Sequence, residues 1–302
     1  MKSRNALLGL SLLLAMPLAA QEKNYVSEVW VADQGNGKYK NPILYADYSD
    51  PDACRVGDDF YMTSSSFNCL PGLQILHSKD LVNWSIIGAA VPYALPPIET
   101  PERPEHGNRV WAPAIRHHNG EFYIFWGDPD QGAFMVKAKD PKGPWTEPVL
   151  VKPGKGIIDT CPFWDEDGKV YMVHAYAGSR AGLKSIISIC ELNADATQAI
   201  TQSRIIFDGH EAHQTCEGPK LYKRGEYYTS SIRQAACPPA GRLSSAPRTY
   251  TALTNGRRYW HRVTALSTAL IREHGSTLLP VKTGSCIFRM SAHTAVWCTC
   301  NL

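Results

Sequence analysis

The sequence predicts an all-β fold, and more specifically a β-propeller, from two observations. Four short segments repeat one local pattern: "GDDFYM" at 57–62, "NGEFYI" at 119–124, "DGKVYM" at 167–172 and "RGEYYT" at 224–229. No amphipathic helical stretch lies between them. Strand-rich units of roughly 50 residues that repeat along a chain are typical of propeller blades. A β-sandwich is the main alternative, because it also contains many short strands with turn signals.

Each repeat is interpreted as a tight turn that leads into a strand. A turn-forming and a charged residue come first, followed by an aromatic or β-branched residue and then Tyr. The aligned tyrosines are spaced by 62, 48 and 57 residues and are Tyr61, Tyr123, Tyr171 and Tyr228. A second element, "HSKDLVNW" at 77–84 and "KAKDPKGPW" at 137–145, is interpreted as closing a unit with Trp.

One distinctive residue lies 11 or 12 positions before each aligned tyrosine: Asp50, Trp111, Asp159 and Glu217. In a propeller the first strand of each blade lines the central axis, so equivalent positions converge on one mouth of the channel. Convergent carboxylates repel one another and resist desolvation, so their pKa values separate, which suits a proton donor and a base. Any one of these residues alone is explained as well by a turn, but their shared offset favours a common site.

Four segments then resemble, in order, the first four blades of family 43 glycoside hydrolases. They are "NPILYADYSDPDACRVGDDFYM", "VWAPAIRHHNGEFYIFWG", "IIDTCPFWDEDGKVYMVHAY" and "CEGPKLYKRGEYY", within about residues 40–228. The resemblance implies a five-bladed β-propeller, here incomplete with about the first three and a half blades. It also implies inverting hydrolysis of xylo- or arabino-oligosaccharides. The sequences of these motifs are most similar to the β-xylosidase and α-L-arabinofuranosidase branch, and they do not decide between xylose and arabinose as the preferred sugar.

The resemblance also implies roles for single residues. Asp50 would be the general base, Glu217 the general acid, and Asp159 the residue that orients the acid and raises its pKa. An inverting site keeps acid and base about 6.5–9.5 Å apart to admit a water. Phe67 and Trp111 are candidates to pack on the sugar ring, although either could equally belong to the core. Six other acidic residues are interpreted as turn residues: Asp52, Asp58, Asp59, Asp165, Glu166 and Asp167.

The N-terminus has the pattern of a secretory signal peptide. Lys2 and Arg4 precede an apolar run at 6–14, and small residues at 17–20 form a cleavage region. The apolar run is too short to span a bilayer, although an uncleaved anchor is the alternative. We therefore expect a signal peptide at 1–20, a periplasmic or extracellular location, and no membrane partner.

The family pattern stops at Tyr228. From Thr229 to Leu302 there are nine Lys and Arg and one acidic residue, Glu273, against 22 and 27 in the rest of the chain. A divergent last blade is one interpretation. However, when allowed codons are read from their third base, the segment from Thr229 reads "FINSAGGVSTGWQTVLRS", which is typical of the last blades of this branch. We interpret 229–302 as an out-of-frame tail, disordered or misfolded, after a truncated propeller at 21–228.

The predicted frame change argues against a nucleic-acid partner and a metal site in this chain. The basic tail then has no functional meaning, so no nucleic-acid partner is expected, and the odd number of cysteines gives no disulfide framework. Many relatives hold a structural calcium through a His, but the candidate His lies in the shifted "GPHQGAW", so no metal site is expected here. The chemistry itself requires no cofactor.

An incomplete propeller leaves strand edges exposed. We therefore expect the chain as written to be aggregation-prone and inactive, as a pseudogene product would be. A non-catalytic carbohydrate-binding propeller is the alternative function, and such a protein would tolerate the loss of Glu217.

Overall fold

A computed structural model describes residues 29–93, 106–211, 215–224, 227–234, 249–254, 285–290 and 296–301. The predicted signal peptide at 1–20 lies outside this part of the chain. The chain divides into two compact units, Met1–Val31 and Ala32–Leu302, and every element named below belongs to the second. The described residues form seventeen strands and one short helix, α1 (Gly178–Ala181), so the predicted all-β class is confirmed.

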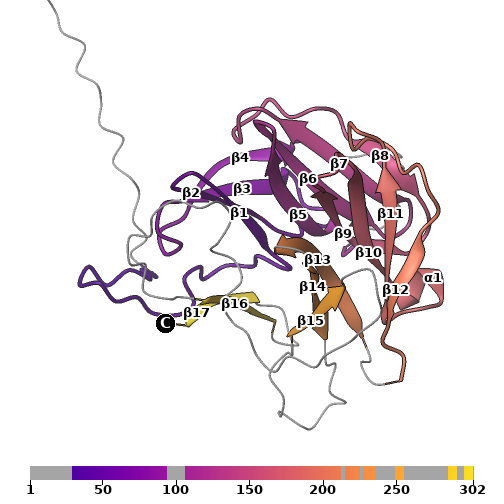
Figure 1. Cartoon of the computed structure of the whole chain (residues 1–302). Coiled ribbons are helices and arrows are strands. Elements are labelled where there is room, and N and C mark those ends of the chain that lie inside the picture. The colour runs from indigo at the N-terminus through magenta and orange to yellow at the C-terminus, as the bar shows by residue number, and fades with distance from the viewer. Residues whose placement is uncertain are drawn as a thin grey trace, which may run out of the picture. The chain divides into compact units, whose positions relative to one another are not determined.

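The strands form antiparallel sheets whose members follow one another along the chain (Figure 1). The first sheet contains β1 (Asp52–Val56), β2 (Asp59–Thr63), β3 (Gly72–Ser78) and β4 (Ser85–Val91). The second contains β5 (Trp111–His118), β6 (Glu121–Asp128), β7 (Gly132–Ala138) and β8 (Val149–Pro153). The third contains β9 (Ile157–Trp164), β10 (Val170–Tyr176), β11 (Ile186–Leu192) and β12 (Arg204–Asp208).

Two smaller sheets follow. The fourth sheet has three strands, β13 (Cys216–Arg224), β14 (Tyr227–Gln234) and β15 (Thr249–Thr254). A separate two-stranded sheet contains β16 (Ser285–Met290) and β17 (Val296–Asn301). Strand β14 continues through the predicted frame boundary, since Thr229 pairs with Tyr222 on one side and Leu253 on the other. The frame change concerns the coding sequence and stays a prediction.

The first strands of the four larger sheets lie next to one another. Strand β1 packs against β5, β5 against β9, and β9 against β13. Each four-stranded sheet is therefore a meander whose first strand is innermost, which is the construction of a propeller blade. Among the described residues, three complete blades and part of a fourth are present, so the predicted incomplete β-propeller is confirmed.

The repeated turn–Tyr pattern marks the second strand of each sheet. The aligned tyrosines lie in β2, β6, β10 and β14, as the pattern predicts: Tyr61, Tyr123, Tyr171 and Tyr228. The interpretation that Trp closes a unit is wrong, because Trp84 comes just before β4 and Trp145 shortly before β8. The Trp84 indole N–H donates to the Leu81 carbonyl at 2.9 Å, so this residue stabilises the loop before the last strand.

The sheets pack through apolar side chains. Between the first and second sheets the core includes Leu73, Ile75, Ile115, Ile124 and Trp126. Between the second and third it includes Phe125, Met135, Val151, Met172 and Cys190. At Gly127 the sheets approach so closely that a Cβ atom would lie 2.6 Å from the Ile158 Cα. None of the described residues belongs to a helix long and apolar enough to cross a membrane.

Candidate active site

Three of the four innermost strands are interrupted at the same place. In β5, β9 and β13, two residues on the inner strand oppose one on its neighbour, which is the signature of a β-bulge. The β5 bulge begins at Trp111, the β9 bulge contains Asp159, and the β13 bulge begins at Glu217. Three of the predicted site residues therefore lie at irregularities of the inner strands, where bulges commonly direct side chains into active sites.

Each of these places has a residue with left-handed backbone geometry. The φ angle is 36° at Ala112, 56° at Asp159 and 65° at Gly218, and it is 46° at Asp50, two residues before the start of β1. Such conformations cost free energy in residues other than glycine and cluster at functional sites. Two of the residues selected by the sequence spacing, Asp50 and Asp159, are therefore left-handed themselves, and the other two, Trp111 and Glu217, directly precede a left-handed residue.

The two candidate sugar-binding aromatic residues are brought close through the backbone. Phe67 (φ 50°) forms an isolated bridge with Val110, and its N–H donates to the Val110 carbonyl at 3.0 Å. The next residue, Trp111, is half-buried, and its indole N–H donates to the Gly107 carbonyl at 2.7 Å. Part of the Trp111 ring packs against a core cluster that includes Ile158, so this residue has a structural role whether or not it also contacts a sugar.

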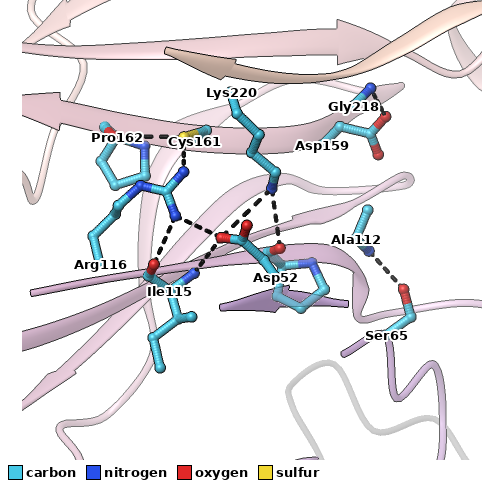
Figure 2. A network of polar contacts seen from close by, with 11 residues as sticks. Asp52, Ser65, Ala112, Ile115, Arg116, Asp159, Cys161, Pro162, Gly218 and Lys220 are labelled. Atoms are coloured by element: carbon cyan, nitrogen blue, oxygen red, sulfur yellow. Dashed lines mark hydrogen bonds and ion pairs between the residues drawn. The ribbon is translucent and has the colours of Figure 1, made fainter. Parts of the chain in front are cut away.

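Asp159 links the third sheet to the fourth. Its side chain is 5% exposed, and Oδ2 accepts a hydrogen bond from the Gly218 N–H at 2.7 Å (Figure 2). Gly218 directly follows Glu217, so this carboxylate fixes the backbone beside the predicted acid. On the other side of Glu217, burial and the Glu217 charge raise the pKa of the Cys216 thiol to about 11.

Asp50 is held by two hydroxyl groups. The Ser49 and Ser65 hydroxyls each donate to Asp50 Oδ2 at 3.0 Å. Ser65 Oγ also accepts a hydrogen bond from the Ala112 N–H at 2.8 Å, which connects the predicted base to the β5 bulge (Figure 2). The sequence analysis missed Ser65, because it lies within the uniform run "SSS" and its partners are distant in the sequence.

An ion cluster around a buried carboxylate, Asp52, lies on the inner strands. Asp52 is 6% exposed, and its Oδ2 accepts from the Ile115 N–H at 3.0 Å, lies 2.6 Å from Arg116 Nη1 and 3.8 Å from Lys220 Nζ. Burial alone would lower the pKa of Arg116, but Asp52, with smaller contributions from Cys161 and Tyr222, more than offsets this and raises it well above its usual value. The interpretation of Asp52 as a turn residue is therefore wrong, since it is a paired carboxylate within β1.

The other acidic residues interpreted as turn residues show two outcomes. Asp58, Glu166 and Asp167 do lie in turns, and Asp165 directly precedes a turn. Asp59 instead begins β2 and forms an ion pair with Lys79 at 2.8 Å.

Carboxylates of the described residues are candidate ligands for the calcium ion that many relatives hold. The described part of the chain contains no group of three or more His, Cys, Asp or Glu side chains placed to hold a metal. The buried Asp52 carboxylate is already paired with two cationic side chains, which would repel a metal ion. The expectation that this chain has no metal site stays a prediction.

Comparison with known proteins identifies what the chain is similar to. Residues 39–238 match the sequence model described as Glycosyl hydrolases family 43. The chain is 34% identical over 201 residues to a beta-xylosidase of Formosa agariphila, covering 63% of this chain and 33% of that protein. It is 34% identical over 215 residues to a non-reducing end alpha-L-arabinofuranosidase of Bacteroides ovatus, covering 66% and 37%.

A solved structure shows the same relationship. The xylan beta-1,4-xylosidase from Bacillus halodurans superposes with a TM-score of 0.60 at 26% identity, over 72% of this chain and 41% of that chain. The chain spans 33% to 37% of the length of the two curated relatives.

Proposed function

Because this chain belongs to glycosyl hydrolases family 43, we propose that its gene encodes an exported enzyme that removes terminal xylose or arabinofuranose residues from xylan-type oligosaccharides. The names of the similar beta-xylosidase and alpha-L-arabinofuranosidase support this class of sugar. The observation that carries the proposal is the hydrogen bond from the Gly218 N–H to Asp159, because it places one carboxylate beside the backbone of another, Glu217.

The proposed reaction is hydrolysis with inversion. Glu217, in its acid form, donates a proton to the glycosidic oxygen as the bond from that oxygen to the anomeric carbon breaks. Asp50, as a carboxylate, removes a proton from a water molecule, which attacks the anomeric carbon from the opposite face. The hydroxyls of Ser49 and Ser65 donate to Asp50, which suits an ionised base.

Asp159 takes no proton in this proposal. Its hydrogen bond to the Gly218 N–H orients the strand segment that carries Glu217. Phe67 and Trp111 are proposed to contact the sugar ring, whose C–H face an aromatic ring complements. Phe67 lies at the edge of the site through its bridge to Val110, next to Trp111.

Whether the printed chain itself hydrolyses substrate depends on its residues after Thr229. We expect the printed chain to be inactive and aggregation-prone, and a protein with the restored reading frame to be active. A soluble, monomeric printed chain that unfolds cooperatively and cleaves p-nitrophenyl xyloside would contradict the first expectation.

The deciding experiment replaces Glu217 by Gln in the frame-restored protein. Removal of a general acid is expected to lower hydrolysis of natural xylo-oligosaccharides by about 10²–10⁴-fold. The loss should be smaller for a p-nitrophenyl glycoside, because p-nitrophenolate leaves without protonation. A purely sugar-binding protein would show no hydrolysis before or after the substitution, and unchanged hydrolysis in the variant would refute the assignment of Glu217.

A further inference from the structure

Three charged side chains from three of the inner strands meet in one cluster, in which Asp52 is buried and Arg116 and Lys220 are partly buried. Asp52 comes from β1, Arg116 from β5 and Lys220 from β13 (Figure 2). Arg116 Nη1 lies 2.6 Å and Lys220 Nζ 3.8 Å from Asp52 Oδ2. Lys220 Nζ also donates to the Pro113 carbonyl of β5 at 3.3 Å. We call these three residues the inner-strand ion cluster.

The Arg116 guanidinium contacts all four innermost strands. It reaches Asp52 of β1, and it donates to the carbonyl of Ile115 in its own strand at 2.7 Å. Its Nη2 donates to Cys161 Sγ of β9 at 3.1 Å. It also lies 5.6 Å from the ring centroid of Tyr222 in β13, a cation–π contact. One side chain thereby joins the strands that position Asp50, Trp111, Asp159 and Glu217.

The cluster residues follow the proposed site residues closely along the inner strands. Asp52 begins β1 two residues after Asp50, and Cys161 directly follows the β9 bulge that contains Asp159. Lys220 directly follows the β13 bulge that begins at Glu217.

The free energy of the cluster does not explain its presence. Taking charges out of water costs free energy that a buried ion pair often fails to recover, and apolar side chains can fill such a site with equal or better stability. Charge-assisted hydrogen bonds differ from apolar contacts in requiring short distances and defined directions. What this cluster adds, compared with apolar side chains in the same place, is therefore a fixed set of distances and directions between the strands.

We propose that the inner-strand ion cluster, centred on Arg116, is a positioning device that holds the four inner strands in one register and so sets the separation of Asp50, Asp159 and Glu217. Its catalytic consequence rests on the proposed function. Arg116, Asp52 and Lys220 are positioning residues in this proposal and do not contact substrate. A misplacement of about 1 Å at a catalytic group can lower a rate by about 10²-fold, so a small loss of register is measurable.

The test is Arg116→Met, which keeps the length of the side chain and removes its charge and donors. The variant should fold, because Asp52 keeps Lys220 as a charged partner. We expect kcat for xylo-oligosaccharide hydrolysis to fall at least about tenfold, with KM changed by less than about twofold. We also expect faster amide hydrogen exchange in β1, β5, β9 and β13 together. Arg116→Lys should restore part of kcat, since an ammonium can reach Asp52 but cannot bond both Asp52 and Cys161.

The control is Lys137→Met, in the same sheet. Lys137 forms an ion pair with Glu121 at 2.9 Å between β6 and β7, and both side chains are more exposed than Asp52. This variant should leave kcat unchanged and alter exchange only in β6 and β7. The control therefore distinguishes the effect of losing an ordinary ion pair from the effect of losing the inner-strand ion cluster on kcat and hydrogen exchange.

Both measurements are made on the printed chain and on the frame-restored protein. An Arg116→Met variant that keeps kcat within twofold, or whose exchange changes only in β5, overturns the proposal. If this variant does not fold, Lys220→Met, which keeps the Asp52–Arg116 pair, is judged by the same criteria. If neither unsubstituted protein hydrolyses substrate, the proposed function fails, and amide hydrogen exchange alone decides whether the cluster positions the strands. Faster exchange in β1, β5, β9 and β13 together supports the positioning role. Faster exchange in β5 alone refutes it.

Discussion

The Asp159 carboxylate accepts a 2.7 Å hydrogen bond from the backbone N–H of Gly218, although 59 residues separate the two in sequence. This contact joins the third sheet to the fourth at the residue that follows Glu217. It predicts different outcomes for two substitutions at Asp159. Asp159→Asn keeps an oxygen that can accept from Gly218, whereas Asp159→Leu leaves the N–H without this partner in a site where Asp159 is 5% exposed.

We expect Asp159→Leu to lower the free energy of unfolding by about 1–3 kcal/mol, the cost of an unsatisfied buried donor. Asp159→Asn should change it by less than about 1 kcal/mol and still lower hydrolysis, because the charge is lost. Urea unfolding and steady-state kinetics measure the two effects. Equal stability of the two variants would show that the hydrogen bond contributes little to the fold.

Ser65 is expected to matter more than Ser49, although both hydroxyls donate to Asp50 at 3.0 Å. Ser65 alone also accepts from the Ala112 N–H and so fixes the base relative to β5. Ser65→Ala should lower kcat by about tenfold, and Ser49→Ala by less, since misplaced catalytic groups lose rate steeply. Steady-state kinetics on the two frame-restored variants provides the comparison, and equal losses would exclude a special role for the Ser65 link.

Gly127 is expected to be the most restrictive glycine between the second and third sheets. An added Cβ would lie 2.6 Å from the Ile158 Cα and 2.7 Å from the Ile157 carbonyl oxygen, both backbone atoms that cannot move alone. Gly127→Ala should therefore lower the free energy of unfolding by about 1–3 kcal/mol or more, as overpacking does.

Gly178→Ala is the matched control for this substitution. Its added Cβ would meet only the Lys184 side chain, at ordinary contact distances starting at 3.4 Å. We expect no loss of stability there, since Ala also restricts the unfolded chain. A denaturation experiment that ranks the two variants in the opposite order would contradict the packing described between the sheets.

The stability of the protein is expected to fall as the pH is lowered from 6.5 to 4, partly because of His174. This side chain is fully buried beside the Ser203 hydroxyl, and burial lowers its pKa from 6.5 to about 4. In this window the unfolded chain binds a proton that the folded chain does not. The stability that neutral His174 preserves is thus present above pH 6.5 and is lost toward pH 4, by up to about 1.4 kcal/mol per pH unit.

His174→Gln should reduce the difference between the unfolding free energies at pH 7 and pH 5, measured in urea. The variant is expected to be less stable at pH 7, but less sensitive to acid. If His174→Gln shows the same pH dependence as the parent, His174 is not the group responsible.

Local patterns predicted the strands and the positions of the site. The turn–Tyr repeat is encoded in six neighbouring residues, and each copy marks the start of a second strand. The offset from that repeat selected Asp50 and Asp159, whose backbone is left-handed, and Glu217, which directly precedes the left-handed Gly218. In contrast, the bulges depend on pairing between two strands, so no single segment of sequence contains them.

The ion cluster was not predictable for the same reason. Asp52 and Arg116 lie 64 residues apart, and each has an ordinary local sequence. An acidic residue beside Pro51 is typical of a turn, and a single Arg before two histidines carries no motif. Only the packing of β1 against β5 brings the two charges together.

The left-handed positions of the inner strands also explain which residue types this architecture favours for its chemistry. Apart from Gly, the residues that tolerate positive φ most readily are Asn and Asp. Two of the four positions are Asp50 and Asp159, and a third is Gly218, beside Glu217. Because a bulged residue is left out of regular strand pairing, its side chain can be exchanged while the neighbouring pairs persist. Left-handed backbone geometry thus suits the carboxylates Asp50 and Asp159, and at Asp159 the β9 bulge also lets the side chain change without loss of the neighbouring strand pairs.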